Sequence, residues 1–195
     1  MVLRRVCVFC GSSPGRSPEY AAAAAALGRA LAGSGIELVF GGGKVGLMGA
    51  LADAALAQGG RVHGVIPHAL VRKELAHPGV TTSTVVDTMH QRKQQMADLA
   101  DGFIALPGGM GTLDELCEVL TWAQLGLHDK PVGLLNARNY FAGFLAQLDH
   151  ACQEGLLRPE HRAMLQVAGD PAALLAAMEG YRPPQSQKWI TRRDV

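Results

Sequence analysis

Short apolar, β-favouring runs alternate with longer runs of helical periodicity along almost all of this 195-residue chain. This alternation predicts parallel strands joined through helices, with right-handed crossovers. We therefore expect an α/β fold, a Rossmann-like doubly wound parallel sheet with helices on both faces. The expected strands are Arg5–Phe9, Ile36–Phe40, Arg61–Ile66, a weaker Thr84–Val86, Asp101–Leu106 and Pro131–Leu135. The expected helices are Pro18–Gly33, Val45–Gln58, Thr88–Ala100, the segment carrying Leu113, Leu116, Val119 and Leu120, then Tyr140–Gln153 and Pro171–Met178.

The composition favours one compact domain. With 48% hydrophobic and 18% charged residues, the chain can bury one sizeable core, which we place in residues 1–180, followed by a C-terminal tail, 181–195. The tail's composition suggests a mobile or dimer-embracing segment. A net charge of +1 provides no strong electrostatic attraction for a polyanion, so nucleic acid is not an expected partner.

The N-terminal apolar run is too short for a secretory signal, and no stretch is long enough to cross a bilayer. We expect a cytoplasmic protein with no membrane partner and with reduced cysteines. Cys7 and Cys10 form C-x-x-C, but both fall inside a predicted strand, whereas the redox motif lies at a helix N-terminus. They are therefore predicted to be core cysteines.

Three glycine-rich loops follow predicted strands: Gly11–Gly15, Gly41–Gly46 and Pro107–Thr112. Ligands of such sheets bind at the carboxyl ends of the strands, so the three loops should surround one site. Glycine also serves tight turns that bind nothing. Two of these loops open helices, whose free N–H groups attract anions, and this favours a phosphate-bearing ligand near Ser12, Gly42 and Gly43.

Two cofactor motifs fail in the second loop. Gly41, Gly43 and Gly46 match G-x-G-x-x-G, but the loop does not follow the first strand, and the next strand ends without an acid for the ribose. The Walker A pattern fails because Val45 follows Lys44 where Ser or Thr should hold magnesium. We predict no cofactor, and no metal, since the seven histidines show no ligand spacing.

Thr112 and Glu115 form T-x-x-E at an expected helix start, which is the pattern of a capping box. The same helix end is the candidate phosphate site, so Glu115 could instead reach the attached sugar and act in catalysis. Upstream, Arg92 and Lys93 lie near the start of a helix in which Met89, Met96 and Leu99 can form an apolar stripe. This polar face could be merely solvated, or Arg92 could offer its fork to a phosphate or carboxylate.

The segment Pro107-Gly-Gly-Met-Gly-Thr-Leu-Asp-Glu115 resembles the P-G-G-x-G-T-x-x-E signature of the LOG ("lonely guy") family, the cytokinin riboside 5′-monophosphate phosphoribohydrolases. Val8–Ser13, Val39–Gly49, Met89–Lys93 and Leu120–Leu135 also resemble family segments. The similarity spans about residues 5 to 150.

The resemblance implies a homodimer that hydrolyses the N-glycosidic bond of a nucleoside 5′-monophosphate, giving free base and ribose 5-phosphate. It implies that Arg92 and Glu115 are the catalytic pair. Our predicted substrate-binding set is Ser12, Gly42, Gly43, Glu74, Met89, Arg92, Lys93, Gly108, Gly109, Met110, Gly111, Thr112, Glu115 and Thr121. Glu74 and Thr121 rest on the resemblance alone.

Two other functions stay open. A nucleotide or molybdenum-cofactor carrier could use the same sheet and loops without turnover. A decarboxylase label is also attached to the family, and that chemistry would need a pyridoxal phosphate lysine, for which neither Lys44 nor Lys93 has independent support. The preferred base is open as well, because Met48, Met89 and Trp122 could line an apolar base pocket or belong to the core.

Overall fold

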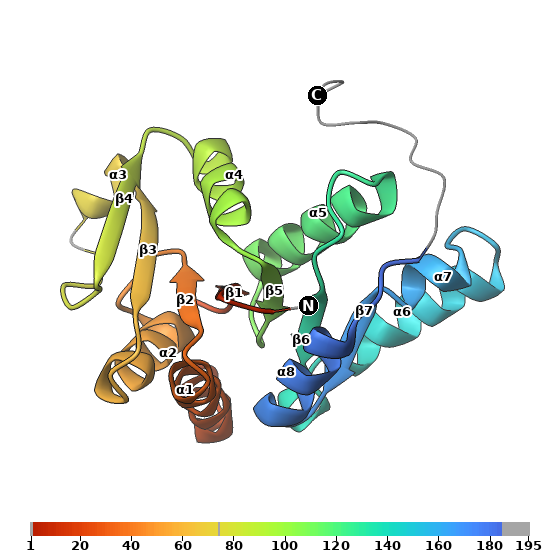
Figure 1. Ribbon diagram of the computed structural model, residues 1–195, viewed down its shortest axis with the longest axis horizontal. Helices are drawn as coiled ribbons and strands as arrows, with labels where there is room; N and C mark the ends of the chain where they lie inside the picture. The colour runs from red at the N-terminus through yellow and green to blue at the C-terminus, as the bar shows by residue number, and fades with distance from the viewer. Residues whose placement is uncertain (1, 74, 185–195) are drawn as a thin grey trace.

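The computed structural model describes residues 2–73 and 75–184 and contains one sheet with helices on both faces (Figure 1). Its seven parallel strands lie in the order β4-β3-β2-β1-β5-β6-β7. The strands are β1 (Arg5–Phe9), β2 (Glu37–Phe40), β3 (Val62–Pro67), β4 (Thr82–Val86), β5 (Gly102–Ala105), β6 (Val132–Leu135) and β7 (Leu165–Ala168). The doubly wound parallel sheet predicted from the sequence is confirmed.

The helices are α1 (Pro18–Gly33), α2 (Gly46–Ala57), α3 (His68–Val71), α4 (Met89–Leu99), α5 (Met110–Leu125), α6 (Ala142–Gln153), α7 (Pro159–Arg162) and α8 (Pro171–Gly180), with a 3-10 turn η1 at Ala137–Asn139. Helix α1 has its predicted bounds because Ser17 caps it, accepting from the N–H of Glu19, and Pro18 occupies the first turn. No helix in the described ranges is long and apolar enough to cross a membrane.

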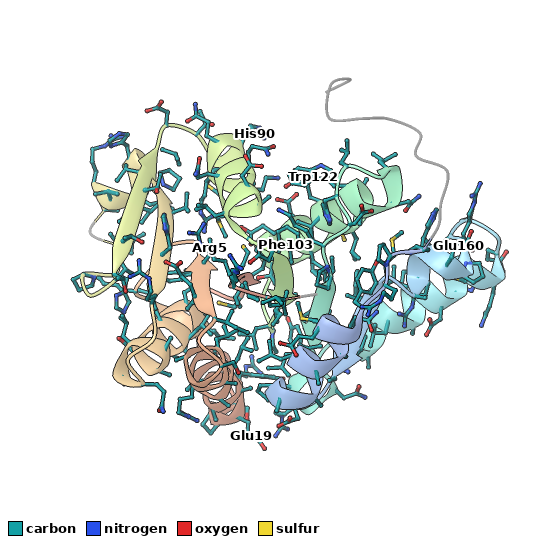
Figure 2. All side chains as sticks on the ribbon, viewed as in Figure 1. Arg5, Glu19, His90, Phe103, Trp122 and Glu160 are labelled. Carbon is teal, nitrogen blue, oxygen red and sulfur yellow. The ribbon has the colours of Figure 1, made fainter. Side chains whose placement is uncertain are left out.

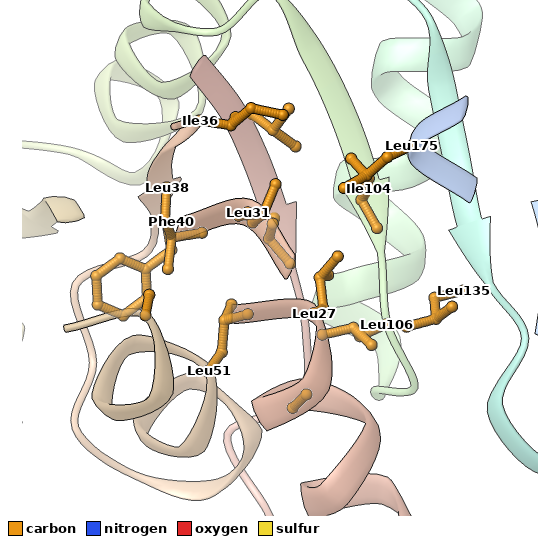
Figure 3. Close-up of a cluster of buried hydrophobic side chains, with 14 of the residues drawn as sticks. Leu27, Leu31, Ile36, Leu38, Phe40, Leu51, Ile104, Leu106, Leu135 and Leu175 are labelled. Carbon is orange, nitrogen blue, oxygen red and sulfur yellow. The ribbon is translucent and has the colours of Figure 1, made fainter. Parts of the chain in front are cut away.

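The sheet separates two cores because successive side chains of a strand point to opposite faces. Val6 and Val8 of β1 join one cluster, and Cys7 and Phe9 join the other. Helices α1, α2 and α8 cover the first face, and Figure 3 shows Leu27 and Leu31 of α1 packed with Leu51, Ile104 and other leucines. Helices α4, α5 and α6 contribute to the second core.

Helices α1 and α2 cross in backbone contact at Gly28. A β-carbon at this position would lie 2.3 Å from the carbonyl oxygen of Leu51, so glycine is required by the close approach. This packing holds α2, and with it the glycine loop Gly41–Gly46, close to the centre of the sheet.

The sequence predictions failed at short or polar elements. The prediction omitted β7, α3, α7 and η1, and it started β4 two residues too late. Tyr140 and Phe141 are not helical residues of α6, contrary to the expected helix Tyr140–Gln153, because Phe141 is its N-cap. Cys10 lies just after β1 and not inside it, although Cys7 is a fully buried core residue as predicted.

Candidate functional site

A cavity of about 730 Å³ lies at the carboxyl ends of the central strands. The chain builds outward from β1 to β4 and then returns to β5 on the other side of β1. The loops that leave β1 and β5 therefore diverge at the point where strand order reverses, which is where doubly wound sheets bind ligands. Helices α4 and α5, on the second face of the sheet, supply one wall of the cavity (Figure 1).

Backbone contacts lock the three glycine loops together. The N–H of Gly11 donates to the carbonyl of Pro107 at 3.0 Å, and the N–H of Leu47 donates to the carbonyl of Gly11 at 3.0 Å. Gly46 has φ +61°, and a β-carbon there would lie 2.3 Å from the backbone of Ser12. The three glycine loops therefore lie together at one edge of the sheet, as predicted.

Most of the predicted site residues line this cavity. They are Ser12, Gly43, Met89, Arg92, Lys93, Gly109, Met110, Gly111, Thr112 and Glu115. Met89 is 48% exposed, so the proposed apolar stripe with Met96 and Leu99 is wrong at its first member.

Four predicted residues are placed differently. Gly42 carries φ +72° and its carbonyl accepts from the N–H of His77, so it shapes the second loop. Gly108 belongs to the third loop but packs against Thr112 and lines a neighbouring cavity instead of this one. Thr121 is exposed further along α5 and donates to the carbonyl of Cys117 at 2.7 Å. Glu74 lies outside the described residues.

Arg92 enters the cavity from the first turn of α4. Thr88 and Gln91 form a capping box that starts this helix. The Nε of Arg92 donates to the carbonyl of Val65 at the end of β3, over 3.2 Å, and its side chain is only 11% exposed. A β-carbon on Gly41 would lie 1.6 Å from Nη2 of Arg92, so the guanidinium lies directly on the backbone of the second loop.

Glu115 faces Arg92 across the cavity, with 3.6 Å between Oε1 and Nη1. The carboxylate does not cap a helix: α5 begins at Met110, its N-cap is Gly109, and Thr112 is already inside the first turn. The capping-box interpretation of Thr112 and Glu115 is therefore wrong. Glu115 sits in the second turn with 12% of its side chain exposed.

Burial raises the pKa of the Glu115 carboxyl to about 7, and the positive charge of Arg92 opposes the rise. A carboxyl with that pKa exchanges protons near neutral pH, as general acids and bases of enzymes do. A strongly shifted carboxyl in a cavity beside a specific charged partner is a typical mark of a functional site.

The side chain of Lys93, on α4, forms ion pairs with two carboxylates of α5. Its Nζ lies 3.2 Å from Asp114 and 2.9 Å from Glu118, with 14% of the side chain exposed. Burial lowers the pKa of the Lys93 ammonium group, but hydrogen bonds to Glu118 and Asp114 outweigh it, so the pKa is raised overall. The amine is therefore kept protonated at neutral pH.

Part of the cavity wall was not predicted from the sequence. Ile66, Leu70 and Leu75 contribute an apolar side, and Cys10 and His90 also line the cavity. Figure 2 shows His90 on α4 and Trp122 further along α5. Trp122 lines a separate hollow with Phe103 and packs against the second core, so of the two alternatives left open for it the structure of the single chain favours the core. No periodic pattern marked the polar segment around α3, although the apolar Leu70 and Leu75 were a weak signal.

The fold and the cavity together define a Rossmann-like α/β protein with an arginine–carboxylate pair at its ligand edge. The sequence matches the family described as possible lysine decarboxylase over residues 48–178. A probable cytokinin riboside 5′-monophosphate phosphoribohydrolase of Oryza sativa subsp. japonica is 50% identical, over 93% of this chain and 74% of that protein. The named enzymes of Arabidopsis thaliana and Rhodococcoides fascians are 48% and 50% identical, over 92% and 90% of this chain and 84% and 89% of their own lengths. This chain belongs to the LOG family of cytokinin riboside 5′-monophosphate phosphoribohydrolases.

Solved structures share the fold at low identity. The molybdenum cofactor binding protein of Rippkaea orientalis has a TM-score of 0.69 and 22% identity, covering 92% of this chain and 98% of that one. The molybdenum cofactor carrier protein of Chlamydomonas reinhardtii has a TM-score of 0.67 and 23% identity, covering 90% and 96%.

Proposed function

We propose that this protein hydrolyses cytokinin riboside 5′-monophosphates, N6-modified adenosine monophosphates, to free base and ribose 5-phosphate. The observation that carries the proposal is the buried Glu115 carboxylate, 3.6 Å from Arg92 in a nucleotide-sized cavity and without a capping role. Relatives that share about half of this sequence and are named for that reaction support it. In the reaction the C1′–N bond breaks, the hydroxyl of water adds to C1′, and a proton goes to the base nitrogen.

The N-terminal end of α5 supplies the phosphate site. Its N-cap, Gly109, has no side chain, so the first-turn amides are not capped by it, and the positive end of the helix dipole faces the cavity. Gly109 and Gly111 have open space around their α-carbons, which leaves room for a phosphate against the backbone. Binding energy from the phosphate, far from the bond that breaks, positions the sugar.

Glu115 and Arg92 act at the ribose. Cleavage passes through an oxocarbenium-like state, and an ionised carboxylate near C1′ stabilises its positive charge, orients the 2′- and 3′-hydroxyls or activates water. Arg92 polarises the water or the sugar hydroxyls, or holds the phosphate, and its charge favours the ionised form of Glu115. The bond from its Nε to Val65 fixes the guanidinium for this task.

The apolar side of the cavity fits an N6-prenyl group. Met48, Ile66, Leu70, Leu75 and Met89 line it, and methionines adapt to irregular ligands. We also propose that unmodified AMP is a substrate, since no polar group is needed there to accept adenine. Less apolar area would then be buried, so AMP should be the poorer substrate.

A decarboxylase function does not fit these lysines. A pyridoxal phosphate Schiff base needs a lysine whose amine is readily deprotonated, whereas Lys93 is bound to two carboxylates and its pKa is raised. Lys44 is exposed. The likeness to molybdenum cofactor carriers, at 22–23% identity, concerns the fold alone.

We also propose a cytoplasmic homodimer that binds small nucleotides and neither nucleic acid nor membrane. Exposed Thr121, further along α5 than Glu115, would contact substrate only if a partner subunit covered it. Light scattering of the purified protein should give twice the mass of one chain, and a monomer would remove Thr121 from the site.

The function is tested by incubating the protein with N6-isopentenyl-AMP, AMP and the corresponding ribosides, and measuring base and ribose 5-phosphate by chromatography. We expect both products in equal amounts from the monophosphates and none from the ribosides. Tight binding without any product would favour the carrier.

A further inference from the structure

The phosphate-binding loop Pro107–Thr112 has little packing around its middle. The main cavity lies on one side, and a second cavity of about 310 Å³, which also involves Gly108 and Gly109, lies beside it. A β-carbon at Gly109 would meet no atom within 4 Å outside its chain neighbours, whereas one at Gly108 would lie 2.1 Å from Oγ1 of Thr112 and 2.9 Å from the nitrogen of Gly11. The open Gly109 end of the loop therefore depends on the contacts that hold Gly108.

One anchor is a tyrosine from a distant part of the chain. The hydroxyl of Tyr140 donates to the carbonyl of Gly108 at 2.6 Å, across 32 residues. The ring is held edge-on by Tyr20, with centroids 5.6 Å apart, and by Phe141 at 5.0 Å. Its hydroxyl is therefore aimed at the loop by packing on two sides.

The turn before Tyr140 is strained. Arg138 and Asn139 have φ of +54° and +57°, a left-handed conformation that non-glycine residues seldom adopt. The side chain of Asn136 braces the turn, donating to Asn139 and accepting from the N–H of Phe141, both at 2.9 Å. Arg138 also pairs with Glu19 of α1. Strain of this kind persists where surrounding contacts over-determine it, and it clusters at functional sites.

The anchored peptide has a defined orientation. The carbonyl of one residue and the N–H of the next point in opposite directions across a trans peptide, and the described chain has no cis bond. With the Gly108 carbonyl turned to Tyr140, the N–H of Gly109 is turned away from the tyrosine. A phosphate in the main cavity would meet that N–H.

We propose that Tyr140 is a positioning residue for nucleotide binding, which orients the Gly108–Gly109 peptide toward the substrate phosphate. The inference rests on the proposed function for the identity of the ligand. It assigns to the β6–α6 connection a role that chain position and composition do not reveal.

The test is calorimetric binding of ribose 5-phosphate, the phosphate-bearing product, to wild type, Tyr140→Phe and the matched control Tyr20→Phe, with Tm measured for each. Loss of one oriented hydrogen bond should raise the Kd of Tyr140→Phe about tenfold. Tyr20→Phe should bind as wild type does, and both variants should keep their Tm within a few degrees. An unchanged Kd in Tyr140→Phe, an equal rise in both variants, or a rise that follows a lowered Tm would overturn the proposal. Ribose 5-phosphate has no N-glycosidic bond to be cleaved, so a wild type that binds it but does not hydrolyse nucleoside monophosphates would sink the proposed function and leave this test intact.

Discussion

The guanidinium of Arg92 lies against the α-carbon of Gly41, so closely that a β-carbon at residue 41 would be 1.6 Å from Nη2. The absence of a side chain at Gly41 is thus part of the binding geometry of Arg92. The glycine at residue 41 therefore leaves room for the guanidinium of Arg92, besides any contact that the loop makes with a ligand.

Gly41→Ala should therefore displace Arg92 and lower kcat/KM about as far as Arg92→Ala does. Only the end of a flexible side chain must move, and the φ of Gly41 is not in the left-handed region, so the protein should still fold. Steady-state kinetics and a thermal melt measure both effects.

The matched control is Gly143→Ala in α6, where an added methyl meets nothing within 4 Å. It should leave kcat/KM unchanged and stabilise the helix by up to about 1 kcal/mol. Full activity in Gly41→Ala would show that Arg92 does not need its present position.

The rate should depend on the ionisation of Glu115. Because its pKa is raised to about 7 and the proposed role needs the carboxylate, kcat/KM should fall about tenfold per pH unit below 7 and reach a plateau above it. A pH profile measured between 5 and 9 tests this dependence. A rate that instead declined above pH 7 would identify Glu115 as a proton donor.

Neighbouring charges should shift this profile in known directions. Asp114 raises the pKa of Glu115 and Lys93 lowers it. Asp114→Asn should move the acidic limb of the kcat/KM profile to lower pH, and Lys93→Met should move it to higher pH. Shifts in the same direction for both variants would contradict this electrostatic account.

The ionisation of Glu115 should also make the stability of the protein depend on pH. The folded pKa of Glu115 lies above its unfolded value of 4.5, so its contribution to stability is fully present below pH 4.5 and is lost as the pH rises through about 7. Denaturant unfolding of wild type and Glu115→Gln should therefore diverge in favour of the variant by on the order of 3 kcal/mol over that interval. A constant difference between the two proteins would mean that the carboxyl is not buried as described.

The sequence predicted the parts of the fold whose residues repeat a pattern. The apolar strands β1, β2, β3, β5 and β6 and the alanine-rich helix α1 follow from their apolar runs and helical composition alone. Edge strand β7, Leu165–Ala168, is only partly buried and carries Gln166 among its apolar residues, so it lacks the continuous apolar run that marks the equally short, fully buried β5 and β6.

Capping patterns were ambiguous in the sequence. T-x-x-Q at Thr88 forms a capping box, whereas T-x-x-E at Thr112 does not, because α5 has already begun at Met110. The glycines that precede Thr112 gave no local signal for that earlier start, which depends on how the third loop packs against Gly11.

The site residues that belong to local sequence motifs were predicted. The contacts that join distant parts of the chain were not. Arg92, Glu115 and the glycine loops were identifiable from motifs. The contact of Tyr140 with Gly108 joins residues 32 positions apart through a strained turn, and no sequence pattern marks it.

The catalytic role of Glu115 is tested most directly by comparing wild type with Glu115→Gln on N6-isopentenyl-AMP, measuring both the Kd and the release of isopentenyladenine. We expect the variant to fold, to bind the nucleotide within a few-fold of wild type, and to release base about 10²–10⁴ times more slowly. A folded Glu115→Gln protein that released the base at the wild-type rate would contradict the claim that this buried carboxylate carries the reaction.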